Sequence, residues 1–381
     1  MSKEKTSSNS NLHKANRAKK DEFYTQLVDI EKELKHYKDQ FHGKVVYCNC
    51  DDPFESNFFK YFASNFNALG LKQLIATSYK PSPIANTQLG LFGDEKTLTK
   101  SKGRPKATAN KFIINDVSDL DGDGAFDLHD IAIQLKANKN NEWAPLKDEG
   151  DFRSEESIEL LKQADIVVTN PPFSLFREYV AQLVEYDKKF LVIGNTNSMT
   201  YKEVFKLFKE DKMRTGYTNF NVGMFFAVPD DWEKFHHIDE KGQKIARVST
   251  SCWFTNMEVT RHKEDIVLYK KYTKEEYPNY DNCDAINVNK VSDIPLDYTG
   301  AMGVPITFLD KYNPEQFEVI GLGISSSGIE VGVRPYKEEH KKYRKEIQKR
   351  GAVDGDLYMI TNGIVNVPFA RVLIKNKKPQ K

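Results

Sequence analysis

Short apolar runs alternate along the chain with segments in which apolar side chains recur every three or four positions. The short runs predict buried strands, and the wider spacing predicts amphipathic helices. The predicted strands are residues 44–49, 71–78, 111–114, 166–168, 190–194, 220–228 and 248–259. The clearest helix patterns between them are residues 58–66, 176–184 and 200–211. Strands that alternate with helices predict an α/β fold, in which helices cover both faces of a largely parallel sheet.

The segment DIVVTNPPFS contains the clearest junction between a strand and a helix. Residues 166–168 are apolar and β-branched, which suits a strand buried on both faces. Two prolines then end the strand, because proline has no N–H to donate and holds φ near about −65°. The carboxyl end of a buried strand is where α/β sheets bind their ligands. The tetrapeptide expected there is Asn170-Pro171-Pro172-Phe173.

This tetrapeptide carries groups that suit a flat molecule with an amino group. The side-chain oxygen of Asn170 and the backbone carbonyl of Pro171 can both accept hydrogens from one planar NH₂ group. The prolines hold these acceptors in place, and Phe173 offers a face on which a flat ring can stack. Two aligned acceptors favour the positive charge that builds on a conjugated amine as it attacks. We therefore assign catalysis to Asn170, Pro171, Pro172 and Phe173; the alternative is a plain strand-to-helix turn.

Size, charge and cysteine content narrow the class of protein. The 381 residues suffice for a catalytic domain and a smaller second domain. The 56 Lys and Arg residues balance 55 Asp and Glu residues, so any nucleic-acid site must arise from local segregation of charge. Residues 1–20 predict a disordered basic lead without a signal peptide, and no apolar stretch approaches the roughly 20 residues that span a membrane. The four cysteines match neither a zinc spacing nor a disulfide framework, so we expect reduced thiols in a cytoplasmic protein that needs no metal.

A change of composition marks residues 81–111, which are rich in Pro, Gly, Thr, Ser and Lys and predict a mobile basic insertion. Lys102, Arg104 and Lys106 belong to a Lys-Gly-Arg-Pro-Lys sequence that resembles the core of an AT-hook, a segment that enters the minor groove of DNA. We assign these three side chains to DNA binding. A solvated linker explains the same composition equally well.

Residues 119–130 place aspartates at the spacing of a twelve-residue calcium loop. Asp130, however, stands where a longer, bidentate Glu is usual, and no clear helix precedes the loop. We therefore favour an acidic turn between strands over a calcium site.

Asp151 and Phe152 precede a helix that we expect to be capped by Ser154. At an exposed strand end, the Asp151 carboxylate can accept a hydrogen from the amino group of an adenine, and the Phe152 ring can pack against its face. The pair therefore predicts an adenine-binding site just upstream of Asn170.

The sequence pattern changes again at residues 293–381, which predict a smaller C-terminal module. Residues 337–350 carry seven Lys or Arg against three Glu, and residues 358–374 predict a hairpin that turns at Asn362-Gly363. A basic, aromatic-bearing module suits the recognition of duplex DNA. A solvated charged helix is the alternative. The residues assigned to DNA binding here are Lys341, Lys342 and Arg344.

Four motifs occur in an order that points to one family. They are Phe-Tyr-Thr at residues 23–25, an acidic turn at residues 51–54, Gly-Asp-Phe at residues 150–152 and Asn-Pro-Pro-Phe at residues 170–173. With the basic C-terminal module, this order resembles the EcoRI-type adenine-specific DNA methyltransferases. The resemblance covers most of residues 20–375.

The resemblance implies a Rossmann-like methyltransferase sheet within residues 21–292, followed by a DNA-recognition module. It implies transfer of a methyl group from S-adenosylmethionine to the 6-amino group of an adenine flipped out of double-stranded DNA. A monomeric enzyme of a restriction-modification system, with no membrane partner, follows from the same family. The positions that match the cofactor site are Tyr24, Thr25, Asp51, Asp52, Pro53, Phe54, Asp151, Phe152 and Asn170. No glycine follows Asp-Pro-Phe, where most relatives have two, so a helix start with solvated acids stays an alternative at that loop.

Two other functions stay open. A protein-glutamine methyltransferase shares the Asn-Pro-Pro-aromatic motif and a planar amide substrate, although such an enzyme needs neither a basic arm nor a basic module. A DNA-binding protein that has lost catalysis would explain the cofactor loop without glycine. The methylated substrate distinguishes the first from a DNA methyltransferase, and cofactor binding distinguishes the second.

Overall fold

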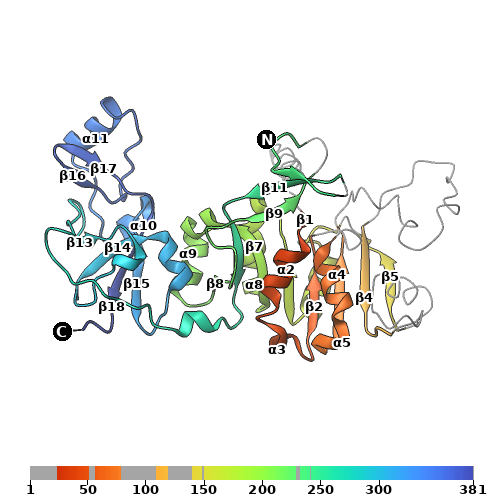
Figure 1. The fold of residues 1–381 in the computed structure, drawn as a ribbon. Helices are drawn as coiled ribbons and strands as arrows, with labels where there is room; N and C mark the ends of the chain where they lie inside the picture. Colours follow the sequence, from red (N-terminus) through yellow and green to blue (C-terminus); the bar gives the residue numbers. More distant parts are fainter. Residues whose placement is uncertain are drawn as a thin grey trace, which may run out of the picture. The chain divides into compact units, whose positions relative to one another are not determined.

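The computed structural model describes residues 24–50, 56–78, 109–118, 140–147, 150–228, 232–240 and 242–380 (Figure 1). These residues form two compact units, which we describe separately. The first unit contains the described residues up to Thr196 and from Gly216 to Glu258. The second contains Asn197–Thr215 and Val259–Lys381. The functional boundary expected at residues 292–293 stays a prediction.

Several predicted features lie outside the described residues. They are the lead at residues 1–20, most of the insertion at residues 81–111, the aspartate-rich loop at residues 119–130, and the side chains of Asp51, Asp52, Pro53, Phe54, Lys102, Arg104 and Lys106.

A large mixed sheet forms the centre of the first unit. Its strands there are ordered β5 (Glu142–Pro145), β4 (Asn110–Ile114), β3 (Gln73–Thr77), β2 (Val45–Cys48), β6 (Ile166–Thr169), β7 (Lys189–Asn195) and β12 (Ser251–Thr255). The four central strands β3, β2, β6 and β7 are parallel, whereas antiparallel pairing joins β4 to β3, β5 to β4 and β12 to β7. The α/β class expected from the sequence is therefore confirmed, with antiparallel strands at the outer positions.

Helices lie before and between the strands of this sheet (Figure 1). They are α2 (Leu27–Leu34), α3 (Lys38–Phe41), α4 (Asn57–Ser64), α5 (Phe66–Leu69), α7 (Glu155–Gln163) and α8 (Phe176–Glu185). The chain passes from β2 through α4 and α5 to β3 in one direction across the sheet, and from β6 through α8 to β7 in the other. Because such crossovers are right-handed, the two connections place helices on opposite faces of the sheet.

Two serines begin helices by the expected chemistry. The Ser56 hydroxyl accepts hydrogen bonds from the N–H groups of Phe58 and Phe59 at the start of α4. The Ser154 hydroxyl accepts from the N–H of Ser157 at the start of α7, which confirms the predicted cap. Each hydroxyl satisfies backbone donors that have no partner within the first helical turn.

A second, smaller sheet lies in the same unit, with the order β1 (Tyr24–Thr25), β9 (Met224–Ala227), β11 (Lys244–Val248) and β10 (His237–Ile238). The expectation that residues 220–228 complete the main sheet is therefore wrong. In β9, buried Met224 and Phe226 alternate with half-buried Phe225 and Ala227. This alternation is typical of an antiparallel strand with one face open, and it differs from the continuous burial of β6.

The second unit is built around an antiparallel sheet with the order β13 (Ala285–Asn287), β14 (Ala301–Pro305), β18 (Arg371–Asn376) and β15 (Phe317–Leu322), in which only β13 and β14 pair in parallel among the described strands. Its remaining elements are α9 (Lys202–Lys209), β8 (Arg214–Thr215), η5 (Thr260–Lys263), η6 (Val291–Asp293), η7 (Ile306–Lys311), α10 (Ser325–Glu330), α11 (Glu338–Glu346), β16 (Met359–Thr361) and β17 (Ile364–Asn366). The η4 turn (Thr196–Thr200) carries the chain into this unit.

The segment Asn197–Thr215 is held by contacts within the second unit. The Lys209 ammonium of α9 donates to the backbone oxygen of Ile320 in β15 at 2.7 Å. The Thr215 hydroxyl donates to the Asp310 carboxylate at 3.0 Å. A piece from the middle of the sequence is therefore part of the C-terminal unit.

The predicted hairpin at residues 358–374 is correct at its turn and wrong in its extent. Thr361 pairs with Ile364 across Asn362-Gly363, and both turn residues have positive φ, of 51° and 76°. Such angles define the two-residue turn that suits twisted strands. Arg371–Asn376 leaves the hairpin, however, and pairs with β14 and β15.

Two further sequence expectations concern thiols and membranes. All four cysteines are free, as expected, and three of them are buried. In the described part of the chain, no helix is long and apolar enough to cross a membrane.

Candidate active site

The predicted catalytic motif follows β6. Beside this strand, the order in which the chain adds strands to the sheet reverses. β6 pairs with β2 on one side and β7 on the other, while β2 also pairs with β3. The connections to β3 and to β7 therefore leave this point in opposite directions. The carboxyl ends of the strands beside such a divergence are the place where α/β sheets bind ligands.

Asn170 and Pro171 are buried at the carboxyl end of β6, whereas Pro172 and Phe173 are half-buried. The short η3 turn (Phe173–Leu175) follows, and its first hydrogen bond joins the Leu175 N–H to the Pro172 oxygen at 2.9 Å. Helix α8 begins directly after it. The motif is therefore held between a buried strand and a helix, as the sequence predicted.

A buried polar network links the ends of β2 and β6. The Thr169 hydroxyl donates to the Asn49 backbone oxygen, and the Tyr179 hydroxyl of α8 donates to the Asn49 side-chain oxygen. Burial raises the pKa of Tyr179 well above its usual value, so this hydroxyl keeps its proton and remains a donor. Because Thr169 immediately precedes Asn170, the network fixes the strand end that carries the motif.

Thr25, one of the positions that match the cofactor site, lies close to the motif. Thr25 pairs with Phe226 across β1 and β9, and the Phe226 ring meets the Phe173 ring edge-on at a centroid distance of 6.5 Å. The Asn57 amide at the start of α4 donates to the Thr25 backbone oxygen at 2.7 Å. Three segments that the sequence singled out, β1, the start of α4 and the motif, are therefore neighbours in this unit.

The Thr25 hydroxyl is the clearest sign of an open hydrogen-bonding position. Thr25 is 1% exposed, and its hydroxyl oxygen has no hydrogen-bond partner among the described residues. Buried hydroxyls are normally hydrogen-bonded, because leaving one unpaired costs about 1–3 kcal/mol. This hydroxyl is therefore a buried, unsatisfied hydrogen-bonding group near the motif.

Asp151 is engaged within the protein. Both carboxylate oxygens accept hydrogen bonds from the Arg153 guanidinium, at 2.9 and 2.7 Å, and Arg153 also pairs with Glu178 of α8. Burial alone would raise the pKa of Asp151, but the hydrogen bonds from the Arg153 side chain and N–H hold it below its usual value. Asp151 is therefore an oriented carboxylate, and its oxygens keep lone pairs for a further donor.

Phe152 is more buried than the sequence suggested. It is 7% exposed, its ring lies edge-on to the Tyr179 ring at 5.1 Å, and its backbone oxygen accepts from Gln182. The preceding Gly150 has φ of 77°, and a Cβ there would lie 2.0 Å from the Ser78 backbone oxygen. A glycine is therefore required for this segment to pass the end of β3.

Comparison with known proteins decides the family. The model of the adenine-specific methyltransferase EcoRI family matches residues 11–377. The chain is 44% identical to the Type II methyltransferase M.EcoRI of Escherichia coli over 99% of both chains. It is 38% identical to the Type II methyltransferase M.MpnI of Mycoplasma pneumoniae over 81% of this chain and 84% of that enzyme. No solved structure matches significantly.

The chain belongs to the EcoRI family of adenine-specific methyltransferases. The family resemblance drawn from the four motifs is thereby confirmed. As a member of this family, the protein uses a methyl donor. In the described residues, no three His, Cys, Asp or Glu side chains are grouped so that they could hold a metal ion.

The three residues of α11 that we assigned to DNA binding have different surroundings. Lys341 forms an ion pair with Asp354 at 3.0 Å, whereas Lys342 is exposed and lies 4.0 Å from Glu346. The Arg344 guanidinium donates to the side-chain oxygen of Gln348 at 2.8 Å. Lys341 is therefore already neutralised by an acid, whereas Arg344 donates to the neutral oxygens of Gln348 and Gly351.

The sequence reasoning missed Asn49 and Tyr179. Asn49 directly follows the first apolar run, just as Asn170 follows the run at residues 166–168. Tyr179 lies three positions after Phe176, on the buried face of α8. Both positions were visible in the pattern, but their pairing across 130 residues was not.

Proposed function

We propose that this methyltransferase transfers a methyl group from S-adenosylmethionine to the 6-amino group of an adenine flipped out of double-stranded DNA. The restriction-modification role follows from its family. One observation carries the proposal: the Asn-Pro-Pro-Phe motif lies at the carboxyl end of β6, at the point where the sheet changes direction. The expectation that the enzyme acts as a monomer in the cytoplasm stays a prediction.

Asn170 and Pro171 are the residues we assign to the reacting amine. The Asn170 side-chain oxygen and the Pro171 backbone oxygen accept its two hydrogens, and this alignment directs the nitrogen lone pair toward the methyl group. These hydrogen bonds strengthen as positive charge develops on the nitrogen, so they stabilise the transition state more than the bound substrate. Pro172 restrains the backbone, and the half-buried Phe173 ring stacks on the flipped base.

The residues present fit S-adenosylmethionine, which supplies an electrophilic methyl group when bound. The unpartnered Thr25 hydroxyl offers it a hydrogen bond, together with Tyr24 on the same strand. Asp151 accepts from the adenine amino group, with Phe152 behind it. The remaining residues that we assign to this site follow β2 and lie outside the described residues: Asp51, Asp52, Pro53 and Phe54.

Basic side chains in two regions are proposed to hold the duplex. Lys342 and Arg344 on α11 are better placed for phosphate than Lys341, whose charge is balanced by Asp354. In the N-terminal part of the chain, the proposed DNA contacts lie outside the described residues: Lys102, Arg104 and Lys106.

Single-turnover transfer of a labelled methyl group to duplex DNA tests the proposal, with the product digested to nucleosides. Asn170→Ala should lower the rate about 10²–10³-fold, the usual cost of losing one preorganised partner of a developing charge. Asn170→Asp should keep more activity, because a carboxylate still offers an oxygen acceptor.

Asn195→Ala is a matched control. Asn195 ends the neighbouring strand β7, and its amide donates to the Thr250 hydroxyl at 2.8 Å. Its loss should change the rate only a few-fold. Label found on protein glutamine would refute the function, and an Asn170→Ala enzyme with near-normal rate would refute the mechanism.

A further inference from the structure

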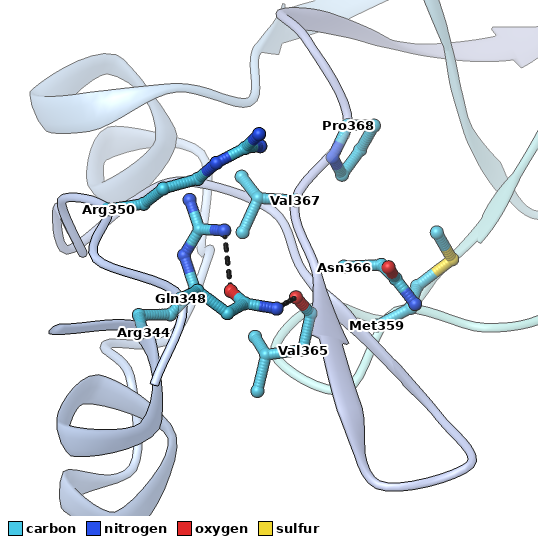
Figure 2. A pocket seen from close by; sticks show the side chains of 8 residues that line it. All are labelled: Arg344, Gln348, Arg350, Met359, Val365, Asn366, Val367 and Pro368. Carbon is cyan, nitrogen blue, oxygen red and sulfur yellow. Dashed lines mark hydrogen bonds between the residues drawn. The ribbon is translucent and has the colours of Figure 1, made fainter. Parts of the chain in front are cut away.

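A cavity of about 470 Å³ lies in the second unit between the end of α11 and the β16–β17 hairpin (Figure 2). Its walls include the guanidinium groups of Arg344 and Arg350 and the amides of Gln348 and Asn366. Val367 and Pro368 are among its apolar residues, and none of its lining residues is acidic. The cavity is therefore positively charged and partly apolar.

Arg344 is held in a fixed orientation. Its guanidinium donates to the Gln348 side-chain oxygen at 2.8 Å, and the Gln348 amide nitrogen donates to the Val365 backbone oxygen at 2.9 Å (Figure 2). A further bond of 3.3 Å reaches the Gly351 backbone oxygen. These neutral acceptors orient the guanidinium without cancelling its charge, and they leave N–H groups that can donate to a ligand.

Arg350 is brought back to the same cavity by a reversal of the chain. Lys349 has φ of 52°, and the Arg350 N–H donates to the Arg344 backbone oxygen at 3.0 Å. The Arg350 side chain is exposed and has no acidic partner within the described part of the chain. Its charge is therefore also uncompensated.

Two of the nearby acids are paired with lysines. Asp354 pairs with Lys341, and Glu346 lies nearest to Lys342. Asp356 accepts a hydrogen bond from the Ser325 N–H and also attracts Arg344, so the positive charge of the cavity lies on Arg350 and, partly offset, on Arg344. A small hydrophobic core supports the hairpin. In this core the Tyr336 and Tyr358 rings stack with their centroids 4.5 Å apart.

We propose that this cavity binds a backbone phosphate of the duplex DNA. Two guanidinium groups without an acid suit a phosphodiester, and the apolar wall suits the adjoining sugar. A base edge is a poorer fit, since Gln348 already uses both its oxygen and its nitrogen within the protein. The assignment rests on the proposed function, which makes DNA the substrate.

The salt dependence of DNA binding tests the assignment. Equilibrium binding is measured between 50 and 200 mM salt for Arg350→Ala, with a target duplex and with a non-target duplex. Loss of one phosphate contact should lower the log–log slope by about 0.9 for both duplexes. Over this fourfold range, the affinity ratio of wild type to variant should therefore change by roughly 3.5-fold. Arg350→Lys should restore most of the slope.

Lys345→Ala is the charge-matched control, because Lys345 lies on the same exposed helix but does not line the cavity. Its slope should stay close to that of the wild type. An Arg350→Ala slope equal to that of Lys345→Ala would overturn the assignment. Weakening confined to the target duplex would also overturn it, because that pattern indicates a base contact.

Methyl transfer by the wild type is measured on the same duplexes. DNA binding with the expected slope change but without adenine methylation would refute the proposed function and leave the phosphate site standing. Adenine methylation without the slope change would refute the phosphate site and leave the proposed function standing. If the wild type binds neither duplex, both proposals are refuted.

Discussion

Replacing Tyr179 by Phe removes one hydroxyl from the network that links β2, β6 and α8. Tyr179 is 0% exposed, and its hydroxyl donates to the side-chain oxygen of Asn49, which is itself buried. The phenylalanine ring can keep the edge-on contact with Phe152. The substitution therefore changes a hydrogen bond and leaves the packing nearly intact.

The size of the effect follows from what Asn49 retains. Without the Tyr179 hydroxyl, the Asn49 side-chain oxygen keeps a weak thiol donor, the Cys50 sulfur at 3.7 Å. Leaving a buried acceptor poorly satisfied costs about 1–3 kcal/mol, so we expect a loss of about 1–2 kcal/mol in the free energy of unfolding. Because Thr169 also bonds to Asn49 and precedes Asn170, the catalytic strand end should shift as well. We expect single-turnover methyl transfer at saturating DNA and cofactor to fall about tenfold, or about 1.4 kcal/mol.

Tyr280→Phe provides the comparison. Tyr280 is also buried, and its hydroxyl donates to the Asn287 side-chain oxygen at 2.7 Å within the second unit. Urea unfolding and single-turnover kinetics at saturating DNA should show a similar loss of stability but a near-normal rate. If Tyr179→Phe lowers stability as expected and methylates DNA at the rate of Tyr280→Phe, the network only stabilises the fold and does not position Asn170.

Further predictions concern the cofactor side. Thr25→Val should weaken S-adenosylmethionine binding by about 0.5–1.5 kcal/mol in calorimetry. It should not lower stability, because the Thr25 hydroxyl has no partner in the described chain. The control Thr255→Val removes a hydroxyl bonded to the Phe190 oxygen, so it should lower stability instead. Asp151→Ala should weaken cofactor binding by about 1–3 kcal/mol. Arg153→Ala should raise the pKa of Asp151, so cofactor affinity should fall at a higher pH than in the wild type as the solution is acidified; an unchanged pH profile would contradict the role of Arg153.

Features set by neighbouring residues could be predicted from the sequence. Buried β6, the prolines after it, the Ser154 cap and the Asn362-Gly363 turn each depend on a few consecutive side chains. Their chemistry is local, so the pattern contains the information. The same holds for the catalytic motif, whose position at a strand end needs only the apolar run and the prolines.

Features set by distant pairing could not be predicted in this way. β1 pairs with β9 about two hundred positions further along the chain, and β18 leaves the hairpin for β14 and β15. An apolar run does not state which strand it joins, since the register depends on packing against both partners. The ion pair of Lys341 with Asp354 likewise depends on how the chain returns after α11, so the basic charge alone did not show that Lys341 has an acidic partner.

The position of Asn197–Thr215 in the sequence bears on how the second unit can be exchanged between related genes. A gene fusion that replaces everything after Glu258 would combine a foreign β15 with the resident α9 and lose the matched contact between Lys209 and Ile320. The hydroxyl of Thr215 would likewise meet whatever residue the donor carries in place of Asp310. An exchange that preserves the unit must move two separated stretches of the gene together. A single recombination event is therefore a poor way to exchange this unit intact, and point substitution within it keeps these contacts.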